Sequence, residues 1–230
     1  MRNALKLSNG FVVTTDNSGG IGEKEADIVS APNDVVSYFA ARVALLEQWA
    51  AHAKVESVII QNFSGDAAWQ AYVSGVENIL EEVGLTSIQI SGSSETNMEL
   101  MQSAMAVTMI GRIQEGMTEE VDAQVSWFIY GQPFVGSEVL NQVDTIADLK
   151  KVKEAMANGL VKKIWPVGSK GIQAEARVLF ANDSLCVNSE LDVGKSAGPS
   201  TVIFISVAHG SVEQARQHFN NEWRELIVIV

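Results

Sequence analysis

The stretch that decides how this sequence is interpreted is Asp16-Asn17-Ser18-Gly19-Gly20-Ile21-Gly22-Glu23-Lys24, which we call the glycine segment. It follows the apolar run Phe11-Val12-Val13, which predicts a short strand, and its closely spaced glycines predict a break in regular structure. Glycine lets backbone N–H groups approach an anion, and successive N–H groups can form a nest for phosphate. Lys24 would neutralise a phosphate there, and Asp16 or Asp27 would hold Mg²⁺. The alternative is a flexible hairpin turn.

Helix and strand patterns alternate in the rest of the first half. The expected elements are a helix that starts at 33–34 and runs to 50, a strand over 57–63, a helix over 67–83, a strand over 87–90, a loop at 92–94 and a strand over 104–113. The Ala and Met content of residues 104–113 also allows a helix there. The order strand, helix, strand, helix, strand, strand predicts an α/β or α+β unit.

The polar, acidic residues 115–122 predict a boundary, so we expect one domain over 1–122 and another over 123–230. The second half is expected to contain a strand at 127–130, a helix over 145–158 capped by Thr145, a turn at 166–171 that leads into a helix over 172–181, a strand over 201–207, a helix over 211–220 and a strand over 226–230.

Composition limits the class of protein. An apolar content of 47% over 230 residues is enough for a full core. With 28 acidic against 16 basic residues and no dense basic run, neither a nucleic-acid partner nor a polybasic membrane anchor is expected. We find no signal-type or membrane-spanning apolar run and expect a soluble, cytoplasmic protein. A single cysteine, Cys186, excludes a disulfide framework and a cysteine metal cage.

The negative charge is concentrated in the first half. Residues 1–120 hold 16 Asp and Glu against 6 Lys and Arg. Such a surface can attract Mg²⁺, and a nucleotide can follow as its metal complex. The alternative is an acidic, solvated surface that serves solubility.

A second segment with ligand chemistry is Gly92-Ser93-Ser94-Glu95-Thr96-Asn97, which follows a predicted strand. Its carboxylate, hydroxyls and amide are hard oxygen ligands of the kind that Mg²⁺ prefers. The alternative is a helix N-cap at Ser94 or Thr96.

Three further places carry cationic groups. Arg42 lies within an apolar helical stretch, where it either faces a phosphate or forms a structural pair such as one with Glu47. Pro166-Val167-Gly168-Ser169-Lys170-Gly171 and Lys195-Ser196-Ala197-Gly198-Pro199-Ser200 either contact an anion near a helix start or form ordinary turns.

Taken in order, these segments resemble the AIR-synthase-related ATP-binding superfamily, which includes aminoimidazole ribonucleotide (AIR) synthetase, thiamine-monophosphate kinase and selenophosphate synthetase. The glycine segment resembles the Asp-Gly-x-Gly-Thr-Lys segment of AIR synthetase, and residues 92–98 resemble its Gly-Gly-Glu-Thr-Ala-Glu-Met loop. The strand over 104–111 follows in the matching place. The glycine segment, residues 38–47 (YFAARVALLE) and residues 166–172 (PVGSKGI) also look like the short α-ribazole kinases of cobalamin salvage.

This resemblance implies a fold and an activity. The fold would be an AIR-synthetase-like N-terminal domain, with a mixed sheet packed by helices, plus a shortened C-terminal α/β domain. The protein would bind ATP with Mg²⁺, phosphorylate the 5′-hydroxyl of α-ribazole, and form a homodimer whose sheets join into a barrel. The other candidates are a non-catalytic ATP-binding regulatory protein and a kinase for another nucleoside or vitamin precursor.

The resemblance also assigns residues. Asp16, Lys24 and Arg42 would act in catalysis, and Asp16, Asp27 and Glu95 would hold the metal. The nucleotide would contact Ser18, Gly19, Gly20, Gly22, Lys24, Gly92, Ser93, Ser94, Thr96 and Lys170. One departure matters: AIR synthetase carries an Asn-Asp pair where this chain has Ala41-Arg42, so a metal-binding acid is missing there.

Overall fold

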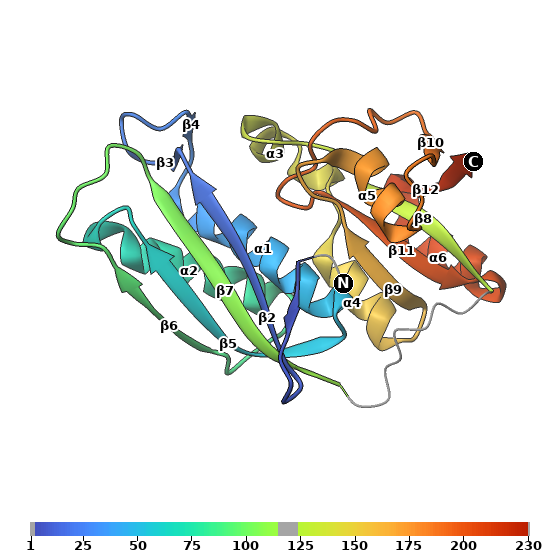
Figure 1. Ribbon diagram of the computed structural model, residues 1–230, viewed down its shortest axis with the longest axis horizontal. Coiled ribbons are helices and arrows are strands. Elements are labelled where there is room, and N and C mark those ends of the chain that lie inside the picture. Colours follow the sequence, from blue (N-terminus) through green and yellow to red (C-terminus); the bar gives the residue numbers. More distant parts are fainter. Residues whose placement is uncertain (1–2, 115–123, 230) are drawn as a thin grey trace. The chain divides into compact units, whose positions relative to one another are not determined.

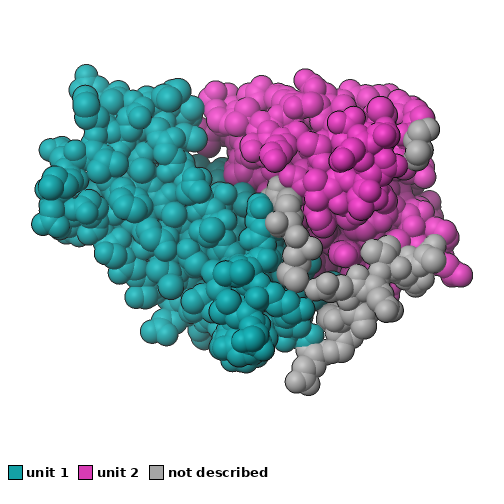
Figure 2. Space-filling model, viewed as in Figure 1, with its two compact units in different colours: residues 1–117 teal, residues 118–230 magenta. Residues whose placement is uncertain are grey.

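The computed structural model describes residues 3–114 and 124–229. The chain forms two compact units, residues 1–117 and 118–230 (Figure 2). The predicted domain boundary between residues 122 and 123 lies outside the described residues.

Unit 1 is built on a five-stranded mixed sheet (Figure 1). Its strands are β1 (Leu5–Lys6), β2 (Phe11–Gly19), β5 (Ala53–Asn62), β6 (Gln89–Ser94) and β7 (Ala104–Ile113), in the order β1-β2-β7-β5-β6. β5 and β6 run parallel, because a helix connects them, and the other neighbours are antiparallel. A small parallel pair, β3 (Ile21–Gly22) with β4 (Val29–Ser30), lies between β2 and the first helix in the sequence.

Two helices cover one face of this sheet: α1 (Asn33–Ala50) and α2 (Trp69–Glu82), the second preceded by a 3₁₀ turn over Asp66–Ala68. Along β7 the side chains alternate strictly, with Met105, Val107 and Met109 buried and the residues between them half-buried. α1 packs on the buried side of β2 and β7, where it is joined to the sheet by buried Gln48, whose Nε2 donates to the carbonyls of Val12 (3.0 Å) and Met109 (2.9 Å).

Two expectations for unit 1 were wrong. The glycine segment does not end regular structure at Val13, because β2 continues to Gly19 and pairs with β7 as far as Ala104. Residues 92–94 are not a loop, because they complete β6. Gly92 suits that position, since a Cβ there would lie 2.1 Å from the Ile60 carbonyl oxygen. The mixed sheet packed by helices is confirmed.

Unit 2 is built on a four-stranded antiparallel sheet in the order β12-β8-β11-β9. Its strands are β8 (Val125–Gly131), β9 (Val161–Pro166), β11 (Val202–Ala208) and β12 (Trp223–Glu225), and a separate pair joins β10 (Cys186–Asn188) to β13 (Ile227–Ile229). Its helices are α3 (Ser137–Asn141), α4 (Leu149–Ala157), α5 (Gly171–Leu179) and α6 (Val212–Phe219), with 3₁₀ turns over Val143–Thr145, His209–Ser211 and Asn220–Glu222.

The helices of unit 2 lie on both faces of its sheet. Ile172 and Ala176 of α5 share a buried cluster with Ile129 and Phe204 on one face. On the other face, Phe219 of α6 packs against Tyr130 with ring centroids 4.7 Å apart. The helix expected over 145–158 is shorter: it starts at Leu149, and its cap is Asp148, whose Oδ1 accepts from the Lys151 N–H, and not Thr145.

None of the described helices is long and apolar enough to cross a membrane. Cys186 is a free, exposed thiol on β10.

Candidate functional site

The two candidate ligand segments of unit 1 lie at the same edge of its sheet. The register pairs Gly19 with Ala104, Met105 with Asn62, and Asn62 with Ser94, so the carboxyl ends of β2, β5 and β6 meet the amino end of β7. We call this the loop edge. In open α/β sheets, ligands bind beyond the carboxyl ends of the strands. The geometry therefore brings the glycine segment and the segment after β6 to the side of the sheet where a ligand is expected.

The chain that follows β2 is fixed to the start of β7 through Asp27. The Asp27 Oδ1 accepts from the Ser103 N–H (2.7 Å), and its Oδ2 accepts from the Ser103 hydroxyl (2.7 Å) and the Lys24 N–H (2.9 Å). Partial burial works to raise the pKa of Asp27, but these hydrogen bonds and the Lys24 charge outweigh it and hold the pKa below its usual value. Both oxygens of this predicted metal ligand are therefore already engaged.

Gly22 is required by the same contact. A Cβ at position 22 would lie 2.4 Å from the Ser103 Oγ and 3.0 Å from the Asp27 Oδ2, and the backbone there has φ +157°. Gly20 has φ +70°, a conformation that favours glycine. Gly19 has open space where a Cβ would be, so its backbone is accessible. The structure thus explains Gly20 and Gly22 by packing and backbone conformation and leaves Gly19 free to approach a ligand.

The two charged residues that end the glycine segment, Glu23 and Lys24, also have hydrogen-bond partners. The Lys24 Nζ donates to the Leu100 carbonyl (2.6 Å) and is half-buried at the loop edge. Glu23 accepts twice from Asn33, the first residue of α1: from its N–H (3.1 Å) and from its Nδ2 (2.9 Å). Glu23 therefore ties the glycine segment to the start of the long helix.

Residues that the sequence did not single out complete the loop edge. Buried Asn62 accepts from the Ser64 N–H (2.9 Å) and donates to the Ser94 Oγ (2.9 Å). The Ser64 Oγ accepts from the Ala104 N–H (3.0 Å) and shares a 2.7 Å hydrogen bond with the Tyr72 hydroxyl. These residues lie in or next to different predicted elements, and only the pairing of β5, β6 and β7 shows that they meet.

The pKa of Tyr72 is affected by the carboxylates of Glu23 and Asp27. Burial raises its pKa, the hydrogen bond with Ser64 opposes that shift, and the charges of Asp27 and Glu23 add to it. The negative charge predicted for the first half is therefore concentrated in part at the loop edge.

Glu95 lies directly after β6 and shapes its own loop. Its Oε1 accepts from the Asn97 N–H (2.7 Å) and the Met98 N–H (3.1 Å), and these backbone donors lower its pKa. No helix begins at Ser94 or Thr96, so the alternative of a helix N-cap is wrong. Ser93 and Thr96 are exposed.

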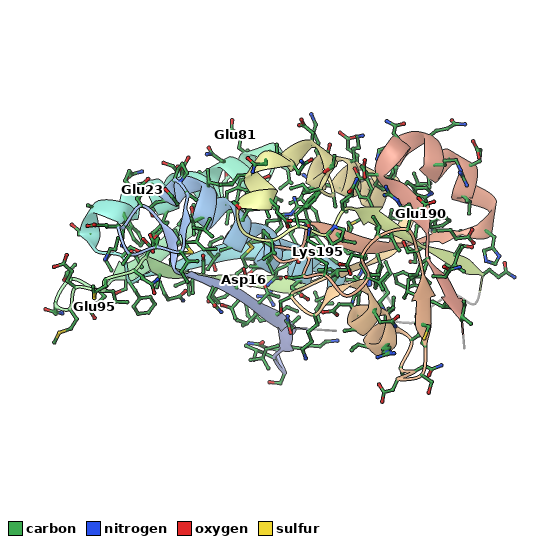
Figure 3. All side chains as sticks on the ribbon, turned by 90° about the horizontal axis from the view of Figure 1, so that it is seen from above. Asp16, Glu23, Glu81, Glu95, Glu190 and Lys195 are labelled. Carbon is green, nitrogen blue, oxygen red and sulfur yellow. The ribbon has the colours of Figure 1, made fainter. Side chains whose placement is uncertain are left out.

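Asp16 lies on β2, away from the other two acids that were expected to hold a metal. Its register partner on β7 is Val107, and alternation places it on the helix-covered side with Thr14, as it does Ser18. β2 and β6 are three strand positions apart, about 14 Å across the sheet. Figure 3 shows Asp16 and Glu95 well separated. Among residues 3–114 and 124–229, no group of three Asp, Glu, His or Cys could hold a metal ion.

Arg42 is buried in α1 and only 1% exposed. It hydrogen-bonds Tyr38, whose hydroxyl donates to the Glu82 carboxylate of α2 (2.5 Å). Burial raises the pKa of Tyr38, Glu82 adds to the shift, and the nearby Arg42 charge opposes it. Arg42 therefore takes part in the contact between the two helices of unit 1 and does not face solvent as the phosphate-binding prediction requires.

In unit 2, two of the predicted turn segments lie against each other. The Ala197 N–H donates to the Gly168 carbonyl (3.2 Å), and the Gln173 N–H donates to the Val193 carbonyl (2.9 Å). Lys170 is exposed beside the start of α5. Lys195 forms a 2.9 Å ion pair with Glu138, and this bond, with a hydrogen bond from the Val135 N–H, lowers the pKa of Glu138.

Comparisons with known proteins show the fold. No protein-family model and no curated protein sequence matches the chain. Among solved structures, it is similar to hydrogenase maturation protein HypE (TM-score 0.67, 12% identity, covering 97% of this chain and 81% of HypE). It is also similar to thiamine monophosphate kinase from Aquifex aeolicus (TM-score 0.65, 10% identity, covering 99% of this chain and 87% of the kinase). HypE has also been solved in complex with ATP, and the Aquifex kinase with AMPPCP and TMP.

Proposed function

We propose that this protein is an ATP-dependent kinase that transfers a phosphoryl group to the hydroxyl of a small molecule. The proposal is supported by the loop edge, which brings Gly19 at the end of β2, Lys24 and Glu95 to one side of a sheet whose fold is shared with proteins solved with ATP or AMPPCP. Phosphoryl transfer depends mainly on positioning and charge neutralisation, so it needs no covalent nucleophile in the protein.

Most of the residues predicted to bind magnesium-bound ATP fit that role at the loop edge, and Asp27 fits it less well. Mg²⁺ in nucleotide sites is commonly held by one or two carboxylates together with substrate phosphates, so a preformed cluster of three acids is not needed. Asp16 and Glu95 belong to strands about 14 Å apart, so each would supply a carboxylate to a different Mg²⁺ ion, and the ions would neutralise phosphate charge. The Gly19 backbone and the Lys24 ammonium would contact phosphate oxygens. Asp27 fits a ligand role less well, because three hydrogen bonds already engage its two oxygens.

The acceptor that we propose is the 5′-hydroxyl of α-ribazole, in the cytoplasm. This choice rests on the resemblance of the glycine segment and of residues 38–47 and 166–172 to the α-ribazole kinases. Ser18, Gly20, Gly92, Ser93, Ser94, Thr96 and Lys170 stay proposed nucleotide contacts.

We also propose that the protein is a homodimer. The supporting feature is the sheet face of unit 1 that α1 and α2 leave uncovered, where Thr15, Thr108 and Gln61 form a chain of 3.2 Å hydrogen bonds across β2, β7 and β5. Sedimentation of the wild type and of Ile110→Arg, a change on that face, tests this: a wild-type monomer would exclude it.

A non-catalytic ATP-binding protein is the second candidate. The burial of Arg42 favours it, since that guanidinium is not positioned to offset charge during phosphoryl transfer. This candidate predicts ATP binding without product.

One assay separates these candidates. The protein is incubated with ATP, Mg²⁺ and α-ribazole, and mass spectrometry is used to look for a phosphate gain on the acceptor. Asp16→Asn should abolish product formation, whereas Asp144→Asn, on an exposed turn of unit 2, should leave it unchanged. Near-normal activity of Asp16→Asn would overturn the assignment of Asp16.

A further inference from the structure

We infer that Asp27 and Ser103 form a latch that holds the glycine segment in its ligand-binding conformation, so that Asp27 is a positioning residue and not a metal ligand. The inference rests on the proposed function, because the ligand in question is ATP.

The contact has the geometry of a two-point clamp. One carboxylate spans the backbone N–H and the side-chain hydroxyl of a single residue, both at 2.7 Å, and also accepts from the Lys24 N–H at 2.9 Å. Hydrogen bonds to an ionised carboxylate are roughly twice as strong as those between neutral groups. Asp27 and Ser103 are 76 residues apart in the chain, so the clamp joins two distant loops, together with the hydrogen bonds from Gly20 to Ser103 and from Lys24 to Leu100.

The clamp is placed where it controls the glycine segment. The Gly20 N–H donates to the Ser103 carbonyl (2.8 Å), so Ser103 holds the chain within the glycine segment at Gly20 and again just after it at Asp27. A side chain longer than hydrogen at position 22 would collide with both members of the clamp. The Lys24 N–H, held by Asp27, fixes the backbone of the residue whose ammonium we place against phosphate.

The residue after Ser103 connects the clamp to the loop that follows β5. It is followed by Ala104, whose N–H donates to the Ser64 Oγ and whose carbonyl accepts from the Phe63 N–H (3.0 Å). The glycine segment and the loop after β5 are therefore anchored to the same two residues. Preorganisation of this kind raises affinity by lowering the ordering cost of binding.

The test compares Asp27→Asn, Ser103→Ala and their double variant with the wild type. Asp66→Asn, at an exposed turn of unit 1, is the matched control. Hydrogen–deuterium exchange without ligand reports the order of residues 20–30, and calorimetry with ATP and Mg²⁺ reports affinity. We expect faster exchange in residues 20–30 with unchanged protection of α1 and β5. We also expect a Kd for ATP raised about tenfold in Asp27→Asn and less in Ser103→Ala. The double variant should bind like Asp27→Asn alone, because the two groups act through one contact.

Each result decides between a latch and a merely structural contact. Faster exchange with an unchanged Kd, or unchanged exchange, would overturn the latch. Should Asp27→Asn unfold, Ser103→Ala removes a single oxygen and decides the question. Should the wild type bind no ATP, the proposed function fails, and that outcome is distinct because the exchange of residues 20–30 is measured without ligand.

Discussion

Gly75 of α2 lies directly against the backbone of α1: a Cβ at position 75 would stand 1.9 Å from the Asp34 carbonyl oxygen and 2.1 Å from the Ser37 Oγ. We expect Gly75→Ala to lower the free energy of unfolding by about 1–3 kcal/mol or more, because the helices must separate, although alanine favours a helix by about 1 kcal/mol. Urea denaturation followed by circular dichroism measures this. Gly210→Ala, where no atom lies within 4 Å of the new Cβ, should change stability little. Equal stability of Gly75→Ala and wild type would contradict the close packing.

Lys24 is the cation of unit 1 that we place against phosphate. Lys24→Met keeps most of the apolar stem but removes the ammonium and its hydrogen bond to Leu100, so we expect the Kd for ATP to rise about tenfold. Calorimetry measures the change. Lys54→Met, on an exposed position of β5 near the opposite end of the strand, serves as the control and should bind normally. Undiminished affinity in Lys24→Met would remove Lys24 from the proposed site.

Trp165 and Glu175 form a buried pair in unit 2, in which the indole Nε1–H donates to the carboxylate at 3.0 Å. Glu175→Leu leaves this donor without a partner and should lower the free energy of unfolding by about 1–3 kcal/mol. Glu175→Gln keeps an acceptor and should cost less. Thermal and urea unfolding of both variants provide the comparison, and equal loss in both would show that the hydrogen bond is not the cause.

Glu138 should report its pairing with Lys195 through its pKa. The ion pair lowers this pKa in the folded protein, so its contribution to stability is present above the ordinary carboxylate pKa and is lost as the pH falls through the lowered one. Lys195→Met should raise the Glu138 pKa, measured by NMR titration of its side-chain carboxyl carbon. Lys170→Met leaves this partner in place and should not shift it, and an unmoved pKa in Lys195→Met would contradict the pairing.

The sequence predicted most elements of unit 1 because their signals are local. α1 has a clear helical apolar pattern, residues 104–113 favoured a strand over a helix, and the structure confirms both as α1 and β7. The end of β2 and the end of β6 were missed for one reason: in the sequence alone, a glycine predicts a break in a strand. At Gly92 the glycine instead admits the Ile60 carbonyl and the Trp69 ring, a contact made by the folded chain.

The candidate site was predicted only in part. The sequence indicated the glycine segment and the residues after β6, and the sheet register places both at one edge. It could not show that Asp27 would accept two hydrogen bonds from Ser103, since that contact joins residues far apart in the chain. Asn62 and Ser64 were missed because a lone amide at the end of a strand and a lone hydroxyl after it carry no motif.

Cys186, the chain's only cysteine, is exposed on β10. A maleimide dye will therefore attach at one place per chain in the otherwise unaltered protein. Copies labelled with donor and acceptor dyes can be mixed, and energy transfer between them will measure self-association at nanomolar concentrations, where scattering methods lose sensitivity.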